Sequence, residues 1–133
     1  MTIVSIRSAG IAFVGLALTA ALGLAQAQGF KRTEVQRGDL SAPGREGVQA
    51  VAEIQPGAQS GKHTHPGEEI GYVLQGPVVV EIDGMAAKTL KTGEGFIIPA
   101  GKVHNARNTG SSVAKVLGTY IIEKGKPLAT PVP

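Results

Sequence analysis

The sequence contains no cysteine and no tryptophan, and aromatic side chains make up only 4% of its 133 residues. The absence of cysteine excludes disulfide bonds, thiolate catalysis, zinc fingers and iron–sulfur clusters. There is no run of basic residues either, although the formal net charge is +3. Scattered charges and few aromatic side chains argue against nucleic acid as a partner.

The sequence also has no internal repeat and no convincing apolar stripe with the 3.6-residue period of an amphipathic helix. It has 19 glycines and 8 prolines, which indicate many turns but stay below the level typical of a disordered chain. The length allows one small domain and little else. We therefore expect a single turn-rich domain built mainly from β-strands.

Residues 1–27 are predicted to be a signal peptide. Arg7 is the only charged residue there, and the apolar run 11–24 is followed by Ala25-Gln26-Ala27, a small-x-small pattern of the kind that signal peptidase cleaves. Cleavage after Ala27 predicts a periplasmic or secreted protein without membrane contact. The alternative is an uncleaved anchor, because the uncharged segment 8–30 is nearly long enough to span a bilayer.

The folded domain is predicted to cover residues 28–123. Residues 124–133 contain three prolines and are predicted to form a loose C-terminal tail. Within the domain, short segments of alternating or β-branched apolar residues are separated by turn residues, of which Asp83-Gly84 is a strong hairpin signal. We expect strands at 48–54, 70–74, 78–82, 88–90, 96–98, 103–107 and 113–122, with a further edge strand at 30–40. This spacing favours an antiparallel sandwich or barrel.

The chemistry of the chain is concentrated in its three histidines. His63 and His65 are separated by one residue, so in a strand both imidazoles project from the same face. Glu69 follows after the break at Pro66-Gly67, which lets the chain bring a carboxylate beside the two rings. Imidazole and carboxylate together suit Mn, Fe, Co, Ni, Cu or Zn better than Ca. Alone, the His-x-His pair is equally compatible with a solvated polar face.

Two longer patterns include every histidine of the chain. They read Gly57-x5-His63-x-His65-x3-Glu69-x6-Gly76 and Gly93-x5-Pro99-x-Gly101-x2-His104-x3-Asn108. Both match the two signature motifs of the cupin superfamily without a departure in spacing, and the sequence resembles small bacterial single-domain cupins over most of residues 28–133. We expect the motif glycines to lie where strands reverse direction, because glycine tolerates positive φ.

The resemblance implies an all-β fold, a jelly-roll (double-stranded β-helix) cupin barrel. It also implies that His63, His65, Glu69 and His104 bind one divalent metal inside this barrel. The identity of the metal stays open among Mn, Fe, Ni, Cu and Zn. By strand alternation, we expect small residues to leave a pocket above the metal, lined by Gly71, Val73 and Ala106.

Four other residues near the motifs have less specific interpretations. Glu68 competes with Glu69 as a ligand, but the motif spacing places Glu68 on the outer face. Tyr72 and Tyr120 are candidate proton donors, although aromatic residues in strands more often serve packing. Asn108 is expected to fix a turn through its side-chain hydrogen bonds.

Three classes of function stay open. The first is a metal-dependent oxygenase or other oxidoreductase acting on a small organic substrate, an activity that the cupin resemblance often implies. The second is a metal-dependent lyase or isomerase, and the third is a protein that binds a small molecule or metal without turnover. The fold alone does not choose among them. The exposed edge at 30–40 and the resemblance to small cupins also predict a homodimer.

Overall fold

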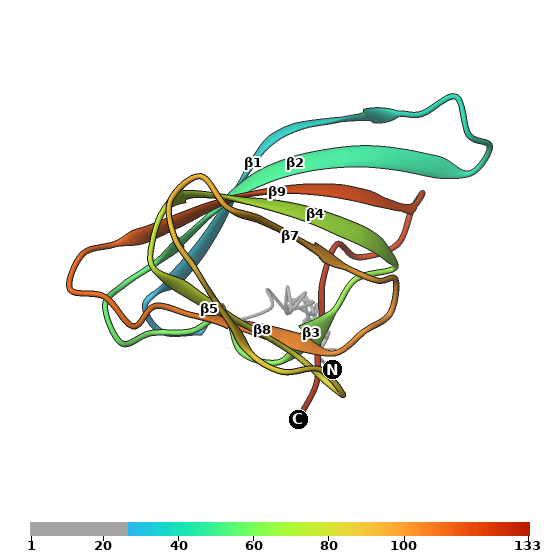
Figure 1. Ribbon diagram of the computed structural model, residues 1–133. Helices are drawn as coiled ribbons and strands as arrows, with labels where there is room; N and C mark the ends of the chain where they lie inside the picture. The colour runs from blue at the N-terminus through green and yellow to red at the C-terminus, as the bar shows by residue number, and fades with distance from the viewer. Residues whose placement is uncertain (1–26) are drawn as a thin grey trace, which may run out of the picture.

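The computed structural model describes residues 27–133, which form two five-stranded antiparallel sheets packed face to face (Figure 1). The predicted signal peptide lies almost entirely outside the described residues. In sheet order, the first sheet comprises β1 (Phe30–Asp39), β2 (Arg45–Ile54), β9 (Ala114–Glu123), β4 (Gly67–Gln75) and β7 (Gly95–Ile98). The second comprises β10 (Thr130–Pro131), β3 (His63–Thr64), β8 (His104–Arg107), β5 (Val78–Ile82) and β6 (Lys88–Leu90).

This arrangement confirms the predicted all-β jelly roll. The described residues contain no helix, and therefore none that is long and apolar enough to cross a membrane. Every predicted strand is present, with ends shifted by up to three residues, and the segment predicted as an edge strand forms β1 at the end of the first sheet.

Strand alternation sets which side chains enter the space between the sheets. Along β4, buried and exposed residues alternate from Gly67 to Leu74, and β9 alternates in the same way between buried and half-buried positions. Successive side chains of a strand point to opposite faces, so one face of each strand packs inside. The register pairs Glu69 of β4 with Tyr120 of β9, which places both side chains on the inner face.

The inner space holds two apolar clusters with the histidines between them. One cluster is built around Ile54, Val80 and Val116, and these three residues also line the small cavity beside His63 and His104. The other contains Tyr120, whose ring packs against His65 with 4.7 Å between ring centroids. The polar groups are therefore held inside the apolar interior of the barrel.

The C-terminal segment differs from the sequence prediction. Residues 124–133 were expected to be loose, but β10 pairs with β3, with Thr130 opposite Thr64 and Pro131 opposite His63. In addition, Leu128 packs against the cluster that contains Tyr120. A two-residue strand beside prolines carries almost no sequence signal, because its stability comes from tertiary pairing.

Three of the four glycines in the two sequence motifs have the expected positive φ angle. Gly57, Gly93 and Gly101 have φ between 70° and 90°. Gly76 is not among the positive-φ glycines; it precedes the cis peptide bond to Pro77. The turn at Gly76 is therefore made by a different backbone geometry from the one predicted.

Candidate metal centre

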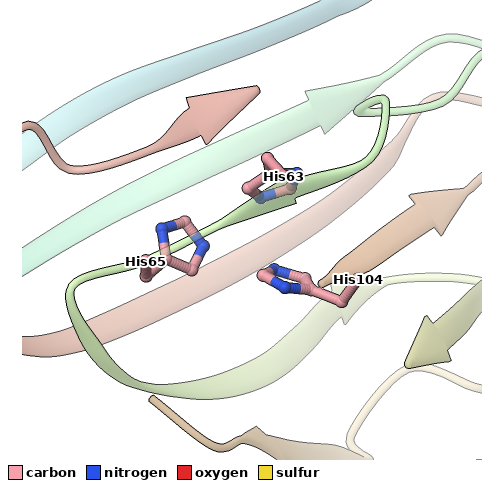
Figure 2. A group of neighbouring side chains, drawn as sticks. All are labelled: His63, His65 and His104. Carbon is pink, nitrogen blue, oxygen red and sulfur yellow. The ribbon is translucent and has the colours of Figure 1, made fainter. Parts of the chain in front are cut away.

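Three histidines converge from two strands of the second sheet (Figure 2). His63 lies in β3 and is paired directly with His104 of β8, while His65 follows β3 by one residue. All three residues are buried, and one ring nitrogen from each lies within 4.8 Å of the others. The side-by-side pairing of β3 and β8 thus brings together residues that are 41 positions apart in the sequence.

The second nitrogen of each imidazole is held by a backbone carbonyl. The Nδ1 atoms of His63, His65 and His104 lie 2.7, 2.5 and 2.9 Å from the carbonyl oxygens of Gly61, Leu128 and Lys102, respectively. A carbonyl oxygen can only accept, so each Nδ1 carries the proton and donates. In a neutral ring this leaves Nε2 with its lone pair available, which is how metal-binding histidines are commonly oriented.

Glu69 reaches the same point from β4 of the opposite sheet. Its Oε2 atom lies 3.2 Å from Nε2 of His65 and 3.3 Å from Nε2 of His104. Among residues 27–133, neither of these buried Nε2 atoms has a partner with hydrogen-bond geometry. These two nitrogen atoms and the carboxylate oxygen could therefore hold a cation between them. This donor set fits a divalent transition metal.

The electrostatics of the site keep its groups ready to bind a cation. Burial lowers the pKa of His63 to about 4, so the ring is neutral at physiological pH. For Glu69, burial raises the pKa, but the two neighbouring imidazoles of His104 and His65 outweigh it and hold the pKa well below its usual range. The carboxylate of Glu69 is consequently ionised at the pH where His63 is neutral.

Tyr120 fixes the other oxygen of Glu69. The Tyr120 hydroxyl donates to Oε1 at 3.1 Å, which leaves Oε2 for the histidine cluster. Burial and the charge of Glu69 raise the pKa of Tyr120, so the phenol stays protonated and remains a donor. The role supported by this geometry is to orient the carboxylate, and it differs from the proton-donor role considered from the sequence.

Two cavities adjoin the cluster. The inner one, about 20 Å³, is lined by His63, Glu69 and His104 together with apolar side chains. This is about the space of a single water molecule or small ion. The outer one, about 510 Å³, lies between β1, the segment before β3 and the C-terminal segment, and His63 lines it too. A small molecule in the outer cavity would therefore meet the cluster at His63.

The three predicted pocket residues occupy different environments. Ala106 lines the inner cavity. The ring of Phe96 lies over Gly71, so closely that an added Cβ atom would come within 2.1 Å of it. Val73 is fully buried in the apolar cluster around Ile54, and neither cavity is lined by it. The space expected above Gly71 is thus filled by an aromatic ring from β7.

The remaining sequence interpretations can also be compared with the structure. Glu68 is exposed on the outer face, as predicted, and Tyr72 is 49% exposed there, away from the histidines. Asn108 fixes its turn as predicted: its Nδ2 donates to the carbonyls of Ile54 and Ser112 at 2.8 and 2.7 Å, and its Oδ1 accepts from the Gly110 amide. This buried amide ties the strand of His104 to the end of β2.

Sequence reasoning missed two groups that contact the histidines. The Leu128 carbonyl has no side-chain signal at all, because any residue supplies a carbonyl. Arg32 lies in β1, and its Nη2 atom is 3.3 Å from Nε2 of His63. Strand alternation could have indicated Arg32: it lies two residues after Phe30 in β1, so both side chains are on the same face, and Phe30 points inward.

Comparison with known proteins agrees with this architecture. The family model described as "Cupin domain" matches residues 50–120. The chain belongs to this family. The matched segment contains the three histidines and Glu69, so the cupin domain carries the whole cluster.

Curated proteins of other organisms match part of this cupin chain. A germin-like protein of Arabidopsis thaliana, subfamily 2 member 2, is 37% identical over 76 residues, which cover 53% of this chain and 35% of that protein. The matches span about a third to a half of the first curated relatives' lengths.

Solved structures support the fold. The polyketide cyclase RemF from Streptomyces resistomycificus superposes with a TM-score of 0.63 at 21% identity, covering 81% of this chain and 74% of that chain. A recombinant oxalate oxidase in complex with glycolate superposes with a TM-score of 0.62 at 24% identity, covering 79% of this chain and 61% of that one. At such identities the likeness establishes the fold alone.

Proposed function

We propose that this cupin binds one divalent transition metal through His63, His65, His104 and Glu69, and that it is a metal-dependent oxidoreductase acting on a small organic substrate. The observation that carries the proposal is the set of inward lone pairs facing a carboxylate inside an apolar barrel. An ion there supplies Lewis acidity and, for a redox-active metal, electron exchange with dioxygen. Four protein ligands leave an octahedral ion with up to two open positions.

The residues of the chain have separable parts in this function. The three imidazoles and Glu69 hold the ion, and the carbonyls of Gly61, Lys102 and Leu128 orient the rings. The surrounding aliphatic side chains keep the inner cavity to about the space of one small ion or water molecule. The outer cavity gives a substrate of modest size access to His63. The likeness to an oxalate oxidase is compatible with oxidation, and the likeness to a polyketide cyclase with a redox-neutral reaction.

Metal binding is tested by elemental analysis of protein purified from its native compartment. We expect about one metal ion per chain, and loss of that ion when His63 or His104 is replaced by alanine. Glu69→Gln is expected to weaken metal binding by about tenfold or more, because an anionic ligand becomes neutral. Glu68→Gln is the matched control, since Glu68 is adjacent in sequence but exposed. Unchanged metal content in the histidine variants would contradict the site.

Oxidoreductase activity is tested by oxygen uptake with a panel of enediols, phenols and dicarboxylates. The protein is reconstituted separately with Mn, Fe, Co, Ni, Cu and Zn. We expect uptake only with redox-active metals and none after Glu69→Gln. Substrate loss without oxygen uptake, under anaerobic conditions and with zinc, would instead support a lyase or isomerase. Binding without loss of substrate would support a non-catalytic protein.

We also propose that the protein is exported and that residues 1–27 are removed. The support is the sequence pattern, which ends at Ala27. Mass spectrometry of the protein from the producing cell tests this, with Gln28 expected as the first residue. Retention of Arg7 in membrane-associated protein would support the alternative of an uncleaved anchor.

A further inference from the structure

Residues 127–132, here called the C-terminal strap, form part of the wall of the outer cavity. The strap follows β9 of the first sheet and runs past β3 of the second sheet, with which β10 pairs (Figure 1). The strap residues that line the cavity are Pro127, Leu128, Ala129, Pro131 and Val132. The rest of the wall comes from β1, β2 and the segment before β3. The cavity is therefore closed on the strap side only while the strap lies against β3.

The position of the strap rests on a short stretch of backbone pairing and on the side chain of Leu128. β10 has two residues, both exposed, and pairs with β3. The Val132 amide donates to the carbonyl of Lys62 at 2.9 Å, and the Leu128 side chain packs against the cluster that contains Tyr120. Segments with so little buried apolar surface open at a lower free energy than the core strands of a domain.

The strap also contacts two of the proposed metal ligands. The carbonyl of Leu128 accepts a hydrogen bond from Nδ1 of His65 at 2.5 Å, and Pro131 lies opposite His63 in the register of β10 and β3. The first contact orients the His65 ring, whose Nε2 lies 3.2 Å from Oε2 of Glu69. When the strap opens, the ring loses this acceptor and its fixed orientation. A metal ion bound to His65 therefore favours the closed strap.

A small molecule in the outer cavity favours the same closed position. The volume of about 510 Å³ is within the range of small-molecule sites. The wall combines Phe30 and Ala50 with Leu128 and Val132 of the strap. A hydrocarbon or aromatic body in the cavity is removed from water by both groups of side chains when the strap is closed, and by the first group alone when it is open.

The charged side chains of the cavity wall have partners within the protein. The residues concerned are Arg32, Glu34 and Lys62. Their partners include His63 and Tyr120 for Arg32, Arg37 for Glu34 and Asp83 for Lys62. The remaining wall is mainly apolar, so contacts with an uncharged body carry most of the recognition.

We infer that the C-terminal strap closes over a small molecule with a hydrocarbon or aromatic body in the outer cavity, and that this molecule and the metal ion strengthen each other's binding by holding the strap closed. The part that concerns the metal rests on the proposed function, whereas closure over the apolar molecule does not. Two ligands that both favour one of two positions raise each other's affinity by the same factor. The strap is thus shared by the metal centre and the small-molecule site.

Hydrogen exchange at the Val132 amide, followed by NMR, measures the opening of the strap. The probe is toluene, which is apolar and does not coordinate zinc. At ten times its dissociation constant, determined by isothermal titration calorimetry, toluene is expected to slow this exchange about tenfold, because it binds the closed strap. Saturating zinc is also expected to slow it about tenfold, as the loss of a group that orients a metal ligand predicts.

The Met85 amide is the control for hydrogen exchange. It donates to the carbonyl of Ile82 at 2.9 Å, the same distance as for Val132, and it lies in the turn between β5 and β6. Neither cavity is lined by Met85. Toluene and zinc are therefore expected to change its exchange less than twofold.

Val132→Pro gives a second readout, because it removes the amide that donates to Lys62. The strap of this variant is expected to be open for a larger fraction of the time, so the two ligands depend more strongly on each other. We expect saturating zinc to raise the toluene affinity of Val132→Pro about threefold or more, measured by calorimetry. The increase is expected to be smaller in Val132→Ala, which keeps the amide.

The outcomes separate this inference from the proposed function. Protein that takes up no zinc would contradict the metal site and with it the coupling, while slower exchange at Val132 with toluene alone would still support closure over an apolar molecule. Toluene binding that leaves this exchange unchanged would overturn the closure, as would no toluene binding up to its solubility limit. Zinc uptake without slower exchange at Val132 would overturn the coupling and leave the metal site standing.

Discussion

At the scale of single residues, the protonation state of His63 links the site to the stability of the fold. Its pKa is lowered to about 4 by burial, from an ordinary value of 6.5. The unfolded chain therefore binds a proton between pH 6.5 and 4 that the folded chain does not. Stability from this group is fully present above pH 6.5 and is lost as the pH falls through that window.

We expect the metal-free protein to lose on the order of 2 kcal/mol of unfolding free energy through His63 between pH 7 and pH 4. Urea denaturation at a series of pH values measures this change. His63→Gln is expected to flatten the curve between pH 6.5 and 4.5, because the titrating group is gone. Below pH 4.5 the lowered pKa of Glu69 adds a further loss in both proteins. Equal slopes for both proteins above pH 4.5 would contradict the explanation.

Gly71 provides a second prediction at this scale. An added Cβ atom would come within 2.1 Å of the Phe96 ring, whereas one at Gly38 would meet nothing within 4 Å. Gly71→Ala is therefore expected to destabilise the protein by about 1–3 kcal/mol through overpacking. Gly38→Ala is the control and is expected to change stability by less than about 0.5 kcal/mol. Thermal or urea unfolding of both variants measures the difference, and equal effects would contradict the packing described.

Single residues also show which features of the site could be predicted from the sequence. The grouping of His63, His65, Glu69 and His104 was implied by the resemblance to the two cupin motifs, which contain all four residues. The occupancy of the space above Gly71 could not be predicted, because it depends on which way the ring of Phe96, 25 residues away, turns across the sheet. Strand parity predicts the face of a residue and says nothing about which neighbour fills the space beside it.

At the scale of elements, the strands of three or more residues were predictable and the two-residue strands were not. β2, β4 and β9 show clear alternation, since one face of each is buried. In contrast, β3 and β10 have two residues each and are held by their pairing across the second sheet. Propensity over two residues is too weak a signal to outweigh tertiary context.

The C-terminal segment supplies a prediction about metal affinity. Truncation after Lys126 removes Leu128, whose carbonyl holds Nδ1 of His65. We expect metal affinity to fall by about 10- to 100-fold, as when a group that orients a metal ligand is lost. Truncation after Ala129 is the control: it removes β10 but keeps Leu128, so a smaller loss is expected. Competition with a chromophoric chelator measures both, and equal affinities in the two truncations would contradict the role of Leu128.

At the scale of the whole molecule, β1 is an exposed end of the first sheet, and the predicted homodimer would cover it. Val35 of β1 is 60% exposed, beside the register shift between Glu34 and Gln36. An uncovered edge with an apolar side chain favours association of a second copy.

We expect sedimentation equilibrium to give twice the mass of one chain, and Val35→Lys to shift the equilibrium toward the monomer. Met85→Lys is the matched control, because Met85 is 55% exposed in the turn between β5 and β6. A wild type that stays monomeric at micromolar to millimolar concentrations would contradict the dimer. So would a dimer that Val35→Lys leaves unchanged while Met85→Lys disrupts it.

The four proposed metal ligands belong to both layers of the jelly roll. His63 and His104 come from the second sheet and Glu69 from the first, so one ion would join the layers at the centre of the barrel. In a domain without cysteine, such an ion would act as a reversible cross-link. The supply of metal would then govern how long the folded protein survives.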